Sequence, residues 1–100
     1  MPLFLVTNVC DEGLYDTSFR VVEAPSRLAV ALYILRNPEP WKWWLQRSHL
    51  WEGVADGRWT ADQLLERIDR THVDGDSDFQ FAIHELKTIE RCDAEGRTPP

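Results

Sequence analysis

The sequence has few cysteines and no long apolar run. Its 100 residues include two cysteines, Cys10 and Cys92, which stand far apart and form no C-x-x-C pair. Neither a zinc site nor a disulfide framework is indicated, so we expect free thiols, although a bridge between the ends of the domain stays open. No apolar stretch reaches the ~20 residues of a membrane span. The start, MPLFLVTNV, lacks the basic region and cleavage site of a secretory signal, so we expect a cytoplasmic protein.

Positive charge is also scarce. The chain has 11 Lys and Arg against 17 Asp and Glu, a formal net charge of −6. Proteins that grip nucleic acid through its phosphates rely on clustered Lys and Arg, so direct nucleic-acid binding is disfavoured. Complementary charge speeds encounter, and an acidic chain therefore favours a larger protein with a basic surface as its partner. A modest negative charge can also do no more than keep a protein soluble, and that explanation of the acidity stays open.

No catalytic set stands out. The histidines His49, His72 and His84 are far apart, and none has a Ser or Cys and a carboxylate at the spacing of a nucleophile system. Adjacent residues of a strand point to opposite faces, so His84 and Glu85 make a poor acid/base pair there. We therefore expect surface or structural histidines, no cofactor, and a protein that is not an enzyme.

The first third of the chain predicts a hairpin followed by a helix. Residues 3–9 and 19–23 are short apolar, β-branched runs on either side of a polar turn. Ser26 is a good cap for a helix over residues 27–36, and the prolines after it end the helix. Apolar residues occupy much of the circumference of this helix, which predicts the most buried helix of the domain.

Two further helices are expected before the last strand. Residues 41–51 place Trp41, Trp44, Leu45 and Ser48 on one side of a helix. A capping box at Thr60–Gln63 then begins a third helix, which faces the core with Leu64, Leu65 and Ile68.

Residues 79–89 fit two structures. As a helix they place apolar residues on one arc, and as a strand they alternate from Phe79 to Ile83. We favour the strand, because a hairpin alone makes a poor sheet. The prediction is an α+β fold: a small antiparallel sheet, made of the N-terminal hairpin and this C-terminal strand, packed against about three helices. Residues 1–92 form the domain, and residues 93–100 form a polar, flexible tail.

Five tryptophans within nineteen residues are the most unusual feature of the sequence. A small domain has difficulty burying so many rings, and Trp and Arg are favoured anchors of protein interfaces. A Trp-rich core beneath the sheet is the competing explanation. We take as candidate partner-binding residues Trp41, Trp43, Trp44, Arg47, Trp51, Arg58 and Trp59.

The acidic stretch VDGDSDF resembles a calcium loop. Asp74, Asp76 and Asp78 occupy the first, third and fifth positions of a twelve-residue EF-hand pattern, and Glu85 occupies the twelfth. The sixth position departs from the pattern, because Phe79 replaces the glycine of the sharp turn. The alternative is an acidic turn whose Asp side chains bond their own backbone.

Glu85-Leu86-Lys87 forms an E-x-K tripeptide that overlaps this loop. It resembles the metal-dependent nucleases of the restriction-enzyme type, in which an upstream Asp and the Glu bind magnesium and the Lys activates water. The resemblance is three residues long, and the acidic chain offers little surface for the substrate. Our preferred hypothesis is a small acidic, non-enzymatic binding protein that modulates a larger protein or complex, and one concrete form of it occupies a basic nucleic-acid-handling surface. The alternative is a divalent-metal-binding protein or a metal-dependent nuclease that uses residues 74–85.

Overall fold

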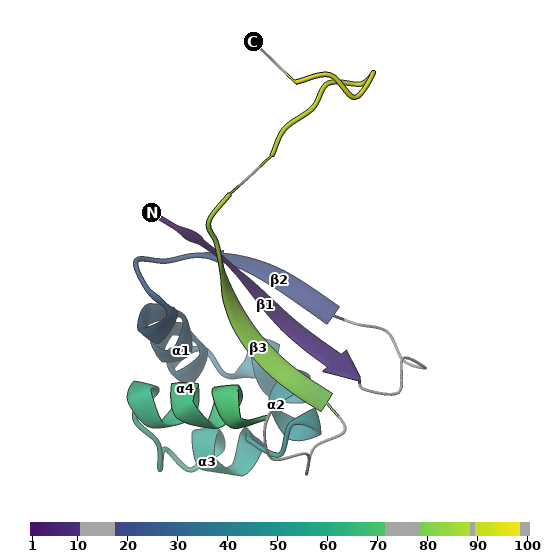
Figure 1. Ribbon diagram of the computed structural model, residues 1–100. Coiled ribbons are helices and arrows are strands. Elements are labelled where there is room, and N and C mark those ends of the chain that lie inside the picture. Colours follow the sequence, from purple (N-terminus) through teal and green to yellow (C-terminus); the bar gives the residue numbers. More distant parts are fainter. Residues whose placement is uncertain (11–17, 72–78, 89, 99–100) are drawn as a thin grey trace.

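A three-stranded antiparallel sheet organises the fold. The computed structural model describes residues 1–10, 18–71, 79–88 and 90–98. Strands β1 (Leu3–Cys10), β2 (Ser18–Glu23) and β3 (Phe79–Leu86) lie in the order β2-β1-β3 (Figure 1). In this register Val6 of β1 faces Arg20 of β2 and Ile83 of β3. The predicted hairpin, the C-terminal strand and the α+β class are confirmed.

The helices lie on one side of this sheet (Figure 1). They are α1 (Arg27–Arg36), the 3-10 turn η1 (Glu39–Trp41), α2 (Lys42–Arg47), α3 (Trp51–Ala55) and α4 (Ala61–Arg70). Both predicted caps are present. The Ser26 hydroxyl accepts a bond from the Ala29 N–H, and Thr60 and Gln63 form a reciprocal capping box. Within the described part of the chain, none of these helices has the length and apolarity needed to cross a membrane.

The single helix expected over residues 41–51 is wrong, because the chain turns sharply at Ser48–Leu50. His49 has a left-handed φ of 60°. The Leu50 N–H bonds the Leu45 carbonyl at 2.7 Å, and the His49 N–H bonds the Gln46 carbonyl at 3.2 Å. This pair of bonds is a Schellman ending, in which glycine usually takes the left-handed position. Histidine stands there instead, so the sequence carries no helix-stop signal.

Helix α1 buries more residues than any other described helix, as the sequence predicted, yet part of its surface is exposed. Val30, Ala31 and Ile34 of α1 are buried, but Leu28 and Leu32 are each 39% exposed. The helices form one layer on one face of the sheet, so the side of α1 that carries Leu28 and Leu32 faces solvent.

The core lies between the sheet and the helices. Inward side chains of β1 and β3 meet buried residues of η1, α2 and α4, including Leu45, Leu64 and Ile68. The aromatic rings pack edge to face: Trp41 and Trp44 have centroids 5.3 Å apart, and Trp44 lies 5.6 Å from Phe81. Such pairs add to the large apolar area that each ring buries.

The C-terminal residues lie away from this body (Figure 1). Residues 90–98 are exposed, and Asp93 closes a small turn by donating its N–H to the Arg97 carbonyl at 2.7 Å. Cys92 in this segment is an exposed free thiol.

Candidate partner-binding surface

The five tryptophans have two different environments. Trp41 and Trp44 belong to the core, with 1% and 4% of their surface exposed. Trp43, between them in sequence, is 56% exposed. Trp51 and Trp59 are half-buried at the edge of the core. The competing predictions of a Trp-rich core and an exposed aromatic surface therefore each describe part of the set.

The helical period separates these environments. Trp44, Leu45 and Ser48 point inward from α2 and its C-terminal turn, as the sequence predicted. Trp43 lies about 100° around the helix from Trp44, because each residue of an α-helix turns by that angle. It therefore leaves the core face and points to solvent.

Arg47 covers the exposed ring. Its guanidinium carbon lies 4.0 Å from the centroid of Trp43, one helical turn earlier. This is within the range of a cation–π interaction and suits the i,i+4 spacing of the pair. The contact holds the indole in one orientation while much of its surface stays accessible.

Trp51 borders a small hollow beside this pair. The hollow has a volume of about 360 Å³ and is lined by Gln46, His49, Trp51 and Glu52. Lys42 of α2 lies 5.1 Å from the centroid of the Trp51 ring. The left-handed turn at His49 sets α3 against the end of α2, so the hollow depends on that turn. The name α2–α3 surface is used below for a set of seven residues: Lys42, Trp43, Gln46, Arg47, His49, Trp51 and Glu52.

Trp59 and Arg58 belong to a different part of the molecule. Trp59 packs over Gly53, where any Cβ would overlap its ring. Arg67 of α4 lies 4.7 Å from its centroid. Arg58 is exposed and pairs with Asp56 at 3.5 Å. The two contacts of Trp59 join α3 to α4, and Arg58 lies in the loop between these helices. The seven predicted residues therefore divide among the core, the α2–α3 surface and this junction.

A basic side chain lies over every tryptophan. Besides the pairs above, the Arg20 guanidinium lies 4.6 Å from the Trp41 ring and 5.5 Å from the Trp44 ring, and it donates to the Pro40 carbonyl at 2.8 Å. Sequence reasoning missed Arg20, because it lies 21 positions before Trp41. The spacing of Trp43 and Arg47 was a readable signal for the local pair.

The acidity of the chain is concentrated in two segments outside the described residues. Residues 11–17 and 72–78 hold six of the 17 acidic residues and none of the Lys and Arg, which accounts for the whole net charge of −6. Their flanking residues meet at one end of the sheet, where Cys10 pairs with Phe79 and Asn8 pairs with Ser18. Both acidic segments therefore join the fold at the same end.

Of the proposed metal ligands, only Glu85 lies in the described residues. Asp74, Asp76 and Asp78 lie outside them. Glu85 is exposed on β3, near the opposite end of the strand from Phe79. Six residues of strand span about 20 Å, so a site combining Glu85 with the three Asp would require residues 74–78 to return along β3. The part of the chain that is described contains no grouping of three or more His, Cys, Asp or Glu suited to a metal ion.

Comparison with known proteins yields no relative: no family model, curated protein or solved structure matches the chain.

Proposed function

We propose that this chain is a small, non-enzymatic binding protein that docks on a larger protein through its α2–α3 surface. The observation that carries this proposal is the exposure of Trp43, which is 56% accessible on a helix whose neighbouring residue, Trp44, is buried in the core. A rigid scaffold thus presents a large aromatic ring to solvent. Trp and Arg dominate the binding energy of protein interfaces, and here Arg47 already lies against the ring.

The turn beside the hollow supports the same assignment. His49 occupies a left-handed position that glycine adopts at lower cost. Strained backbone of this kind tends to occur at functional sites, where the side chain matters more than local stability. His49 lines the hollow beside Trp51, so its side chain is available to a group that enters there.

The acidic end of the sheet lies next to this surface. The Asn8 side-chain amide donates to the Ser48 hydroxyl at 3.3 Å, and Ser48 directly precedes His49. Asn8 pairs with Ser18 at the end of the sheet where both acidic segments join. A partner on the α2–α3 surface therefore approaches close to the origins of those segments, and a basic partner gains from their charge.

A basic surface on a nucleic-acid-handling complex fits this combination. Such a surface binds polyanions through Lys and Arg, and an acidic protein competes for the same residues. Occupation of that surface would inhibit or modulate the complex without any chemistry by the chain itself. We expect this to take place in the cytoplasm.

Site-specific photo-crosslinking in the source cell tests the docking surface. A photoreactive amino acid at Gln46 lies on the α2–α3 surface and leaves Trp43 intact. The matched control carries it at Leu28, an exposed residue of α1. We expect a discrete crosslinked protein from position 46 and none from position 28. The same product from both positions, or from neither, would contradict the assignment.

A further inference from the structure

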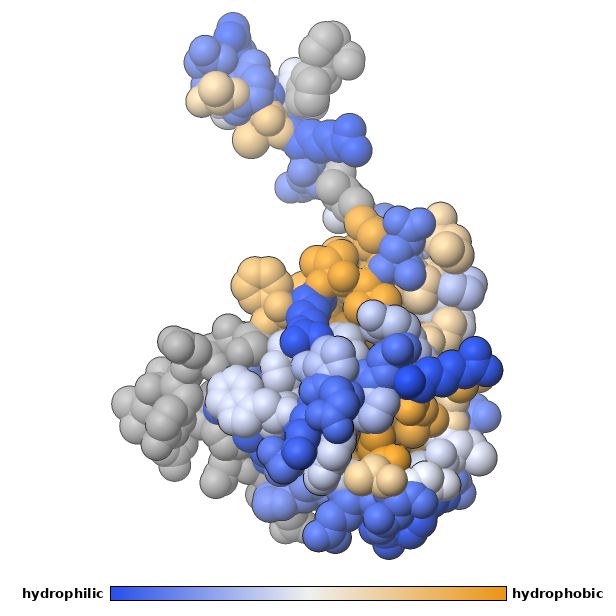
Figure 2. All heavy atoms as spheres, turned by 180° about the vertical axis from the view of Figure 1, so that it is seen from behind, coloured by the Kyte–Doolittle hydropathy of each residue, from blue (hydrophilic) through white to orange (hydrophobic). Residues whose placement is uncertain are grey.

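The exposed apolar side chains of the fold are unevenly placed. Seen from behind the view of Figure 1, hydrophobic side chains gather in two groups separated by hydrophilic ones (Figure 2). On the sheet, the most exposed are Phe19 at 67% and Val21 at 54%, both on β2. On the face of the sheet that packs against the helices, residues of β1 such as Val6 are fully buried. Phe19 and Val21 therefore point to the side of the sheet opposite the helices.

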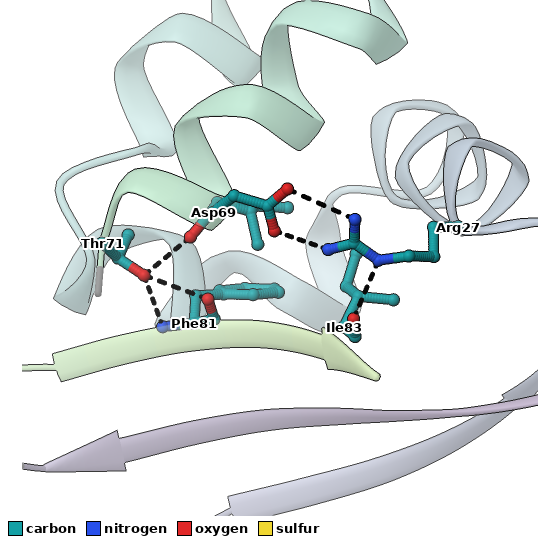
Figure 3. A network of polar contacts seen from close by, with 6 residues as sticks. Arg27, Asp69, Thr71, Phe81 and Ile83 are labelled. Carbon is teal, nitrogen blue, oxygen red and sulfur yellow. Dashed lines mark hydrogen bonds and ion pairs between the residues drawn. The ribbon is translucent and has the colours of Figure 1, made fainter. Parts of the chain in front are cut away.

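The outer edge of β3 is closed by side chains. The Thr71 hydroxyl accepts a bond from the Phe81 N–H at 3.0 Å and lies 3.0 Å from the Phe81 carbonyl oxygen. Arg27 donates Nε–H to the Ile83 carbonyl at 3.0 Å and forms a two-bond ion pair with Asp69 (Figure 3). The backbone of Phe81 and Ile83 thus faces away from β1, and both residues are covered. No further strand can pair there without breaking these bonds.

This geometry also fixes which groups of β2 face outward. Backbone groups of an antiparallel strand bond alternately to one neighbour and the other. Since Phe81 and Ile83 bond away from β1, their register partners Asn8 and Val6 bond toward β2. The partners of those residues, Ser18 and Arg20, bond toward β1 in turn. The N–H and C=O groups that point to the free edge of β2 therefore belong to Phe19, Val21 and Glu23.

Those outward groups have no hydrogen-bond partner among the described residues. The strand, SFRVVE, contains no proline and no lysine, two residues that commonly block an edge. The two edges of the sheet differ: the β3 edge is covered by Thr71 and Arg27, and the β2 edge presents bare backbone beside two exposed apolar side chains. Such an edge is a template for strand addition.

We infer that β2 pairs with β2 of a second copy of this chain, in antiparallel orientation about Val21. In this register Val21 faces Val21 of the partner, Phe19 faces the partner's Glu23, and Arg20 faces the partner's Val22. All residues from 19 to 23 then pair. A shift that centres the pair on Arg20 would oppose two like charges, which destabilises a sheet. The strand is thus complementary to itself in one register.

The antiparallel orientation also keeps the acidic segments of the two copies apart. The acidic segment 11–17 enters β2 at Ser18. In an antiparallel pair the Ser18 ends point in opposite directions, so the acidic segments of the two copies join the sheet at opposite ends of the shared ladder. The product is a six-stranded sheet with the order β3-β1-β2-β2-β1-β3 and both helical layers on one face, because directly opposed residues point to the same side. The two copies are related by a two-fold axis, and two-fold symmetric dimers are the commonest homo-oligomers.

Sedimentation equilibrium of the full chain over the micromolar range tests the pairing. We expect a concentration-dependent mass approaching twice the 11.7 kDa of the chain. Val21→Pro removes the central outward N–H, a change that edge strands tolerate, and Val21→Lys places charge on the two-fold axis. Each should weaken association by about tenfold or more. The matched control Leu32→Lys alters another exposed apolar residue, on α1, and should leave the dimer intact.

Hydrogen exchange supplies a readout that keeps the test valid if a variant is less stable. In the unmodified chain, the Phe19 and Val21 amides should become protected as concentration rises, while that of Arg20, bonded within the sheet, stays protected throughout. A monomer at all concentrations would overturn the inference, as would a dimer that both Val21 variants leave unchanged. Protection of Phe19 and Val21 that requires a different protein would assign the edge to that protein instead.

Discussion

Trp41 and Trp43 are two residues apart, yet the fold uses them in opposite ways. Trp41 is enclosed by Trp44, Phe81 and Tyr33, with a guanidinium over its ring. Trp43 has Arg47 on one side and solvent on another. The difference shows that aromatic density in a sequence does not by itself distinguish a core from an interface. The period of the helix makes that distinction, by turning alternate rings toward or away from the sheet.

Replacement of each tryptophan by alanine should give the largest contrast. Trp41→Ala opens a cavity in the core and should lower the free energy of unfolding by about 3–5 kcal/mol. Trp43→Ala removes an exposed ring and should change it by only about 0.5 kcal/mol. Urea unfolding of both variants measures the difference. Equal losses would mean that Trp43 is a core residue and would break the comparison.

Trp59 lies between these extremes and can be tested through Gly53. A Cβ at position 53 would overlap the Trp59 ring, so Gly53→Ala should cost about 1–3 kcal/mol, offset in part by the ~1 kcal/mol that alanine gains in a helix. The double variant Gly53→Ala with Trp59→Ala removes the overlap. In a double-mutant cycle the two changes should therefore cost less together than their separate costs predict. Additive costs would show that the ring does not press on this position.

The turn at His49 sharpens the comparison on the exposed side. His49→Gly relieves a left-handed backbone and should stabilise the fold by about 0.5–1 kcal/mol. The same change removes a side chain of the hollow and should weaken partner binding. His49→Ala keeps the strain and removes the imidazole, so it separates the two effects. Thermal unfolding and binding measured on both variants give the answer; a fall in stability for His49→Gly would refute the strain argument.

The smallest expected effect concerns calcium and magnesium. A ligand that binds only the folded state raises the melting temperature. We expect no such rise at millimolar metal, because Phe79 begins a strand where a calcium loop needs a glycine turn. Thermal unfolding with and without metal, with Asp76→Asn as the control, checks this. A rise that Asp76→Asn abolishes would favour the metal-binding alternative over the binding protein proposed above.

The sequence predicted the strands and the helix caps well, because those features are local or strongly patterned. The Ser26 cap and the Thr60 capping box follow from short-range spacing, whereas β3 was preferred over a helix because a hairpin alone makes a poor sheet. The break after α2 was missed, since a histidine occupies the position where glycine would announce it. The exposure of Leu28 and Leu32 could not be read either, because it depends on how many layers cover α1.

The candidate surface was only partly predictable, for a related reason. The sequence identified the tryptophans but could not separate Trp41 and Trp44 from Trp43, because that choice depends on where α2 meets the sheet. The approach of Asn8 to Ser48, which brings the acidic end of the sheet beside the α2–α3 surface, links residues 40 positions apart and leaves no local pattern.

The most direct test of the central claim is quantitative capture of partners from the source-cell lysate by tagged protein, compared among the unmodified chain, Trp43→Ala and Leu28→Ala at low and moderate salt. We predict one stoichiometric partner, retained by the unmodified chain and by Leu28→Ala, reduced about tenfold or more by Trp43→Ala, and weakened as salt screens the acidic segments. Equal capture by Trp43→Ala, or the absence of any specific partner at both salt concentrations, would contradict the account.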